Sequence, residues 1–100
     1  MLKILKSIVI AVILSSILMG RALAGEIKSI AILTPEEGTD YGWNQQGIDA
    51  AKAAGKAAGV EVVVAQGLGY GDVRPTLREL ASDGASLLIA HASGYNTSAP

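Results

Sequence analysis

Residues 29–90 of this 100-residue chain divide into five blocks that differ in their pattern of apolar and polar residues. Three short blocks, residues 29–33, 61–65 and 86–90, are almost continuously apolar and rich in Ile, Val and Leu. Such runs are typical of parallel strands that are buried on both faces. The two longer blocks between them have helical patterns. The order strand, helix, strand, helix, strand therefore predicts an α/β fold (βαβαβ), a parallel sheet with flanking helices joined by right-handed crossovers.

The first predicted helix begins with Thr39 or Asp40 as its N-cap, whose side-chain oxygen accepts a hydrogen bond from an exposed helical N–H. It runs to about Ala58 and is ended by Gly59. Small side chains on its inner face predict close packing on the sheet. This expected face holds Gly47, Ile48, Ala51, Ala54, Gly55 and Ala58.

The second predicted helix has Asp72 as its N-cap, tolerates Pro75 in its first turn and is closed by Gly84. Apolar residues recur along it at intervals of three and four, which is the pattern of a half-buried helix. Its expected inner face holds Val73, Thr76, Leu77, Leu80 and Ala81.

The first 24 residues have the pattern of a secretory signal. Lys3 and Lys6 give a positive start, residues 8–18 form an apolar run broken only by two serines, and residues 22–24 are a small-x-small cleavage site. The alternative, a transmembrane anchor, is disfavoured because a spanning helix needs about 20 apolar residues. We expect cleavage after Ala24 and a soluble periplasmic product with no membrane anchor. The remaining residues 25–100 are expected to form part of one N-terminal α/β lobe.

Composition narrows the possible partners. Without residues 1–24 the chain has five basic and nine acidic residues, a net charge of −4. An acidic chain without a basic patch argues against nucleic-acid binding, which needs positive charge to meet phosphates. The chain has no cysteine, which excludes disulfides, thiolate catalysis, cysteine zinc sites and a cysteine-linked lipid anchor in it.

The four aromatic residues of the chain all follow predicted strands. Tyr41 and Trp43 come after the first strand, Tyr70 after the second and Tyr95 after the third, and we expect none of them inside a strand or helix. Ligands of open α/β sheets bind at the carboxyl ends of the strands. Four rings gathered at that edge predict a stacking surface for a flat or ring-shaped ligand.

Residues 40–44 combine a carboxylate, two rings and an amide at the junction between the first strand and the first helix. In a functional hypothesis, Tyr41 or Trp43 stacks on the ligand, and Asp40 and Asn44 hydrogen-bond to its polar edge. In a structural hypothesis, Asp40 is only an N-cap and Trp43 is a staple against the sheet. The residues alone favour neither hypothesis.

Three other features carry no argument for catalysis. The glycine-rich residues 67–71 lack the third glycine of a dinucleotide-binding fingerprint and follow the second strand, so a flexible ligand-facing loop is favoured over a phosphate cradle. The only histidine, His91, has no evident base partner or metal-ligand companion and is expected to be structural. Asn96 opens a glycosylation sequon, a motif that is common by chance. We expect no catalytic residue, no cofactor and no metal.

The chain resembles the N-terminal part of the basic membrane protein family of ABC-transporter solute-binding proteins, which are similar to nucleoside receptors. The resemblance is carried by the signal segment, by Lys-Ser-Ile-Ala-Ile-Leu-Thr-Pro at residues 28–35, by Asp-Tyr-Gly-Trp-Asn at residues 40–44 and by the Ala/Gly-rich helix. Residues 78–90 also resemble the second helix and third strand of that family. The similarity covers about residues 28–96, and sugar-binding relatives of the same fold share much of it. The chain departs from the family in two ways. Many members are lipoproteins, whereas this chain has no cysteine to carry a lipid. The family has two lobes joined by a hinge, whereas this chain is expected to cover only the beginning of the first lobe.

The resemblance implies the first part of a type I periplasmic-binding-protein lobe. Asp40, Trp43 and Asn44 match the family's Asp-x-x-aromatic-Asn loop motif, and Ser93 and Tyr95 lie in the next ligand-facing loop. The complete candidate ligand-binding set is therefore Asp40, Tyr41, Trp43, Asn44, Tyr70, Ser93 and Tyr95.

The implied function is binding without chemistry. The expected ligand is a small, polar, ring-containing and nucleoside-like solute, and the expected protein partner is an ABC-transporter permease. The alternatives are a sugar-binding relative of the same fold, a Rossmann-like nucleotide-using enzyme domain and a receiver-like signalling domain. The export signal disfavours the last two, because nucleotides and phosphorelays are cytoplasmic.

Overall fold

The computed structural model describes residues 3–4, 6–7 and 26–99. The expected signal segment and its cleavage site lie almost wholly outside these residues, so that prediction stays an expectation. Within the described ranges, no helix combines the length and the apolar character needed to cross a membrane.

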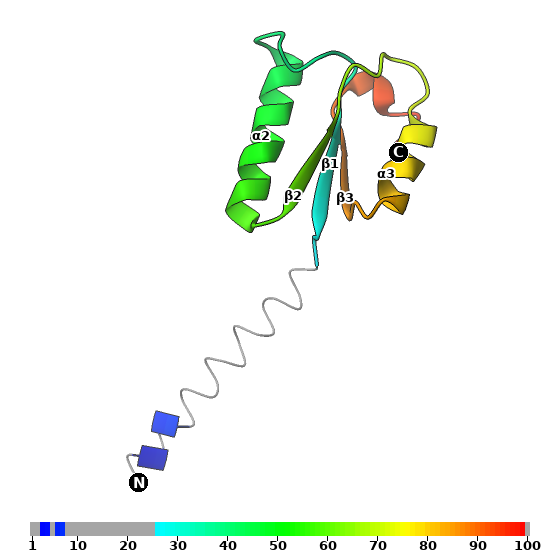
Figure 1. Cartoon of the computed structure of the whole chain (residues 1–100). Helices are drawn as coiled ribbons and strands as arrows, with labels where there is room; N and C mark the ends of the chain where they lie inside the picture. The colour runs from blue at the N-terminus through cyan, green and yellow to red at the C-terminus, as the bar shows by residue number, and fades with distance from the viewer. Residues whose placement is uncertain (1–2, 5, 8–25, 100) are drawn as a thin grey trace.

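The described chain forms a three-stranded parallel sheet with the order β2-β1-β3 (Figure 1). β1 spans Ser29–Leu33, β2 spans Glu61–Ala65 and β3 spans Leu87–Ala90. The register pairs Ile32 of β1 with Val64 on one side and with Ile89 on the other. The predicted α/β fold with a parallel sheet is confirmed.

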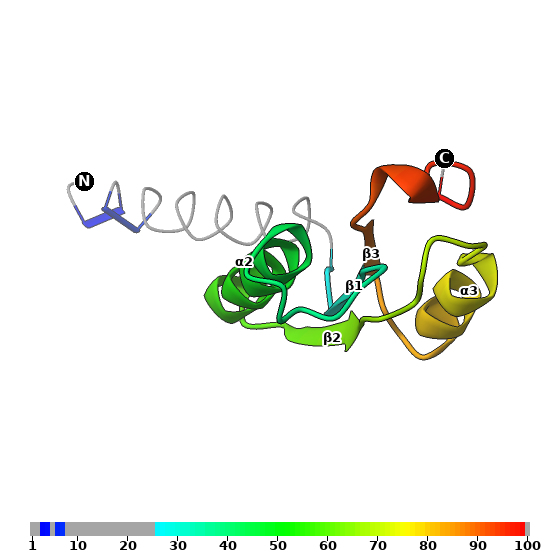
Figure 2. The ribbon, with the colours of Figure 1, turned by 90° about the horizontal axis from the view of Figure 1, so that it is seen from above.

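Two helices cover the two faces of the sheet. α2 spans Trp43–Ala58 and α3 spans Arg74–Ser82, and Figure 2 shows them on opposite sides of the strands. The strand order requires this arrangement when both crossovers have the same hand, because β1 to β2 and β2 to β3 cross the sheet in opposite directions. A short 3₁₀ helix, η1, follows β3 at Ser93–Tyr95.

The core on the α2 face joins the helix to the middle of the sheet. Ile32 packs there with Ile48 and Ala51 of α2, and the partly buried Val62, Val64 and Ile89 surround them. Gly55 is buried against β2, where a Cβ would collide with the side chain of Val62. The expected inner face is thus confirmed at Ile48, Ala51 and Gly55, whereas Ala54 and Ala58 are exposed because the buried stripe is narrower than expected.

The core on the α3 face centres on Leu33, Val73 and Tyr95. The inner face expected for the second helix is correct for Val73, which is buried, and for Leu77 and Leu80, which pack against this core. Ala81 is exposed, so its expected burial is wrong.

Both helices begin later than predicted. α2 begins at Trp43, with Gly42 at the N-cap position, and α3 begins at Arg74, with Val73 at that position. The expectation that no aromatic residue lies inside a helix is wrong for Trp43, the first residue of α2, and for Tyr95, the last residue of η1. The cause at both ends is an aspartate that lies before the N-cap residue and still accepts hydrogen bonds from the first turn, as described below.

We predict that Gly55→Ala lowers the free energy of unfolding by up to about 2 kcal/mol net, because overpacking a core usually costs about 1–3 kcal/mol. The new methyl group must displace Val62, and this cost exceeds the gain of about 1 kcal/mol that alanine brings over glycine in a helix. Ala54→Gly on the exposed face of α2 is the matched control, because it changes helix propensity alone. Chemical denaturation followed by circular dichroism measures both; a Gly55→Ala protein more stable than wild type would contradict the close packing.

Candidate functional site

A cavity lies where the chain connections diverge from the central strand. The loop after β1 leads to α2 on one face of the sheet, whereas Ala92 and Tyr95, after β3, pack in the core of the α3 face. Ligands of open α/β sheets bind in the crevice where connections part in this way. The structure has a cavity of about 330 Å³ at this edge. It is lined by Pro35 after β1, Tyr70 after β2, Ala92 and Ser93 after β3, and Trp43 at the start of α2.

Trp43 is held against the loop that follows β3. Its ring stacks on that of His91, with the centroids 4.5 Å apart and the planes 11° from parallel. The indole Nε1–H donates to the backbone oxygen of His91 over 3.2 Å, and His91 Nε2 lies 2.9 Å from the backbone oxygen of Trp43. Trp43 nevertheless remains 62% exposed and lines the cavity. It is therefore anchored without being buried, which neither sequence hypothesis anticipated.

Asp40 serves as the cap of α2 from a position before the helix. Its Oδ1 accepts from the backbone N–H groups of Gly42 and Gln45, and its Oδ2 accepts from the backbone N–H of Asn44 and from Asn44 Nδ2. These bonds, that from the Asn44 side chain foremost, hold the pKa of the Asp40 carboxyl well below its usual range. The structural hypothesis therefore describes Asp40 better than the functional one.

Asn44 does not face a ligand in this structure. It is 4% exposed, and its amide nitrogen donates to Asp40 Oδ2 over 2.9 Å while its Oδ1 accepts from the backbone N–H of Glu36 over 3.4 Å. The expectation that Asn44 meets the polar edge of a ligand is corrected, because the amide already joins the two ends of the loop between β1 and α2.

Tyr41 is the most exposed of the aromatic residues, at 91%, and it does not line the cavity. Its backbone has φ of 53°, in the left-handed region that non-glycine residues rarely adopt. Its N–H donates to Gln45 Oε1 over 3.0 Å, which fixes the turn. The structure thus places the ring of Tyr41 in solvent, outside the lining of the cavity.

Tyr70 extends from the glycine-rich loop after β2 and is 64% exposed. Backbone bonds hold this loop to the end of β1: Leu68 N–H donates to the oxygen of Thr34, and Gly69 N–H donates to the oxygen of Pro35. These two amides are therefore unavailable to a phosphate. The loop places Tyr70 in the lining of the cavity, with the amides of Leu68 and Gly69 already engaged.

Tyr95 is turned inward. It is 1% exposed, and its hydroxyl donates to the backbone oxygen of Gly69 over 2.6 Å. Burial, and secondarily the nearby Tyr70, raise the pKa of this phenol. Tyr95 therefore supports the loop that carries Tyr70, which corrects the expectation of an open ring at this position. Ser93, in contrast, is exposed and lines the cavity.

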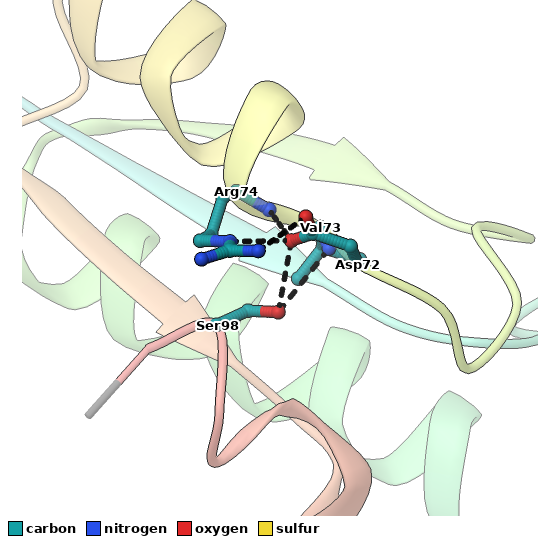
Figure 3. Close-up of polar contacts among 4 residues, drawn as sticks. All are labelled: Asp72, Val73, Arg74 and Ser98. Atoms are coloured by element: carbon teal, nitrogen blue, oxygen red, sulfur yellow. Dashed lines mark hydrogen bonds and ion pairs between the residues drawn. The ribbon is translucent and has the colours of Figure 1, made fainter.

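A second cavity of about 370 Å³ lies on the other side of Tyr70, beside the start of α3. Its polar residues form the network in Figure 3: Arg74 and Asp72 pair over 2.8 Å, and Ser98 Oγ donates to Asp72 and accepts from the N–H of Val73. The hydrogen bond that the Arg74 side chain donates lowers the pKa of Asp72. The same hydrogen bond raises the pKa of Arg74. Asp72 also accepts the backbone N–H of Arg74 over 3.0 Å.

Both helices that point at this edge are therefore already supplied with an anion. A helix N-terminus attracts negative charge through its free N–H groups and its dipole. Asp40 fills that role at α2 and Asp72 at α3. Among the described residues, no group of three or more His, Asp or Glu side chains could hold a metal ion. The site as built suits an uncharged ligand held by aromatic faces and a few polar groups.

Three residues at the site were not among the candidates predicted from the sequence. Pro35 and Ala92 line the cavity, and His91 supports Trp43. All three directly follow a strand or lie within two residues of its end, and that position was the available signal.

The low pKa of Asp40 predicts a pH dependence. Because folding depresses this pKa, the carboxylate contributes stability that is fully present above its unfolded pKa of about 3.9 and is lost as the pH falls through the folded value. The difference in stability between wild type and Asp40→Asn should be constant above about pH 5 and should shrink below about pH 4. Denaturation of both proteins between pH 2 and 7 tests this; Asp72 titrates in both and cancels. A pH-independent difference would show that the charge of Asp40 does not act in the cap.

We predict that Tyr41→Asn leaves the free energy of unfolding unchanged or raises it by up to about 1 kcal/mol, because asparagine tolerates the left-handed region. Tyr41→Ala is the control, since it removes the same exposed ring without that tolerance. The difference between the two variants in thermal denaturation isolates the backbone effect. Tyr41→Asn less stable than Tyr41→Ala would contradict the left-handed turn.

Comparison of the chain with protein-family models, with curated proteins and with solved structures finds no match.

Proposed function

We propose that this chain begins an exported solute-binding protein, which binds a small, uncharged, ring-containing solute in the crevice at the carboxyl edge of the sheet and delivers it to an ABC-transporter permease. The observation that carries the proposal is the cavity of about 330 Å³ at the switch point between β1 and β3, where Trp43 and Tyr70 offer exposed aromatic surface. The signal-like residues 1–24 and the resemblance to basic membrane proteins support export and transport.

The chemistry of the lining favours a neutral, flat solute. Trp43 and Tyr70 supply rings, Pro35 and Ala92 supply apolar surface, and Ser93 supplies a hydroxyl that can donate and accept. Ligand pockets commonly combine predominantly apolar surface with a small number of polar groups that fix orientation. A nucleoside or free nucleobase matches this combination, since its base stacks on aromatic rings and its edge hydrogen-bonds.

The capped helices argue against a phosphorylated solute. A phosphate brought to α2 or α3 would meet the carboxylates of Asp40 and Asp72, whose low pKa values keep them charged at neutral pH. The same point disfavours a nucleotide-using enzyme domain, which needs free helix N-terminal amides for the phosphates. A sugar-binding relative of this fold remains the alternative to be separated by experiment.

Binding itself is the proposed mechanism. The cavity is open to solvent on one side, and the resemblance to a two-lobed family implies that a second lobe closes over the solute by hinge motion. Closure then excludes water from the stacked rings, and the closed form is the one that a permease recognises. No bond is made or broken in the solute.

The test is a titration of the exported protein with inosine, adenosine, their 5′-monophosphates, ribose and glucose, followed by calorimetry. We expect a nucleoside to bind and its monophosphate to bind more weakly. Trp43→Ala should weaken nucleoside binding by about 1–3 kcal/mol, the range for removal of an aromatic ring that stacks on a base. The free energy of unfolding should fall by less than the roughly 3–5 kcal/mol of a buried tryptophan, because Trp43 is more than half exposed and loses only its stacking and one hydrogen bond with His91.

The matched control is Ile27→Ala, which removes an exposed apolar side chain just before β1, at the opposite end of the strands. It should leave nucleoside affinity unchanged. Binding of ribose or glucose in preference to nucleosides would favour the sugar-binding alternative. Unchanged affinity in a stably folded Trp43→Ala protein would remove this crevice from the binding site.

A further inference from the structure

We infer that His91 is a positioning residue, which fixes the indole of Trp43 so that part of its surface is presented to the cavity. This inference rests on the proposed function. His91 is not among the residues that line the cavity, so it acts on a solute only through Trp43.

The two residues are joined by three contacts at once. The rings stack 4.5 Å apart and nearly parallel, and each residue also bonds to the backbone of the other. A carbonyl oxygen can only accept, so the contact between His91 Nε2 and the Trp43 oxygen requires the proton on Nε2. The pair therefore fixes the tilt of the indole, through stacking, and its rotation, through the Nε1–H bond.

Gly47 makes room for the imidazole from the other side. It lies one helical turn after Trp43 in α2, and a Cβ at this position would collide with Cδ2, Nε2 and Cε1 of His91. Glycine is unfavourable in the interior of a helix, so its presence here needs a local reason. The imidazole fits between the indole and the helix backbone only because position 47 has no side chain.

His91 is itself held by the sheet. Its backbone N–H donates to the oxygen of Leu33 over 2.9 Å, which continues the pairing of β3 with β1 by one residue. The position of the indole is thus set by the central strand, through His91, and not by the loop between β1 and α2. An aromatic surface held in place before the solute arrives loses less conformational freedom on binding.

The experiment measures the indole first without any solute. The Nε1–H signal of Trp43 is identified by its loss in Trp43→Phe, and its nanosecond motion is measured by ¹⁵N relaxation. His91→Ala and Gly47→Ala should both raise the mobility of this group, the second variant by displacing the imidazole without removing it. His91→Phe keeps a flat ring and should restore the stacked position in part. Lys52→Ala on the exposed face of α2 is the control and should leave the signal unchanged.

Inosine affinity is then measured on the same proteins. His91→Ala and Gly47→Ala should raise the Kd by about tenfold, near the upper end of the effect of ordering one side chain on binding. His91→Phe should lose less affinity than His91→Ala. Thermal denaturation accompanies each measurement, so that a fall in affinity is read only in proteins that remain folded at the assay temperature.

The outcomes separate this inference from the proposed function. If wild type binds no nucleoside, the proposed function fails. The mobility of the Trp43 indole in the protein without solute still decides whether His91 positions that indole. Unchanged mobility in His91→Ala overturns the inference. Weaker inosine binding with unchanged mobility also overturns it, because His91 would then contact the solute directly.

Discussion

The central position of β1 is the constraint on which the rest of the structure depends. Residues 30–34 are almost completely buried, and β1 pairs with β2 on one side and with β3 on the other. Ile32 faces the core under α2, and Leu33 faces the core under α3. At its carboxyl end the chain after β1 leads to α2, whereas the chain after β3 packs against the α3 face. The crevice lies where these two connections part, and the side chains beside it give it its chemistry.

The strands could be predicted almost to the residue, because a strand that is buried on both faces appears in the sequence as a continuous apolar run. The runs at residues 29–33 and 61–65 match β1 and β2, and the third run exceeds β3 by one residue, Ser86. Ser86 lies just before the strand, where its hydroxyl and backbone N–H both donate to the Ser29 oxygen and its hydroxyl also accepts from Lys28 N–H. Hydroxyl contacts of this kind depend on a partner 57 residues away, which no local pattern contains.

The candidate site was predictable as a region and not as a set of side-chain orientations. Each strand end carries an aromatic residue in its loop, and that placement correctly indicated the edge where the cavity lies. Whether a ring points out or in is decided by tertiary contacts: Tyr70 is exposed, whereas Tyr95 fills the α3 core and bonds to Gly69. His91 shows the same limit, since its partner Trp43 lies 48 residues away. Asn44 bonds to Asp40 and Glu36, only four and eight residues earlier, but its inward orientation depends on the fold of the loop that they share. The start of α2 was predicted too early for a related reason. Asp40 accepts from an amide of the first helical turn although the left-handed Tyr41 separates it from the helix.

The strand order also bears on how fast this chain can fold. Ile30 pairs with Val62, 32 residues later in the sequence, and with Leu87, 57 residues later. Contacts between such distant residues require loop closure before they return any stabilisation, and chains rich in them fold slowly. β1 cannot complete both of its pairings until β3 has been synthesised, so the sheet cannot form on an emerging chain before residue 90.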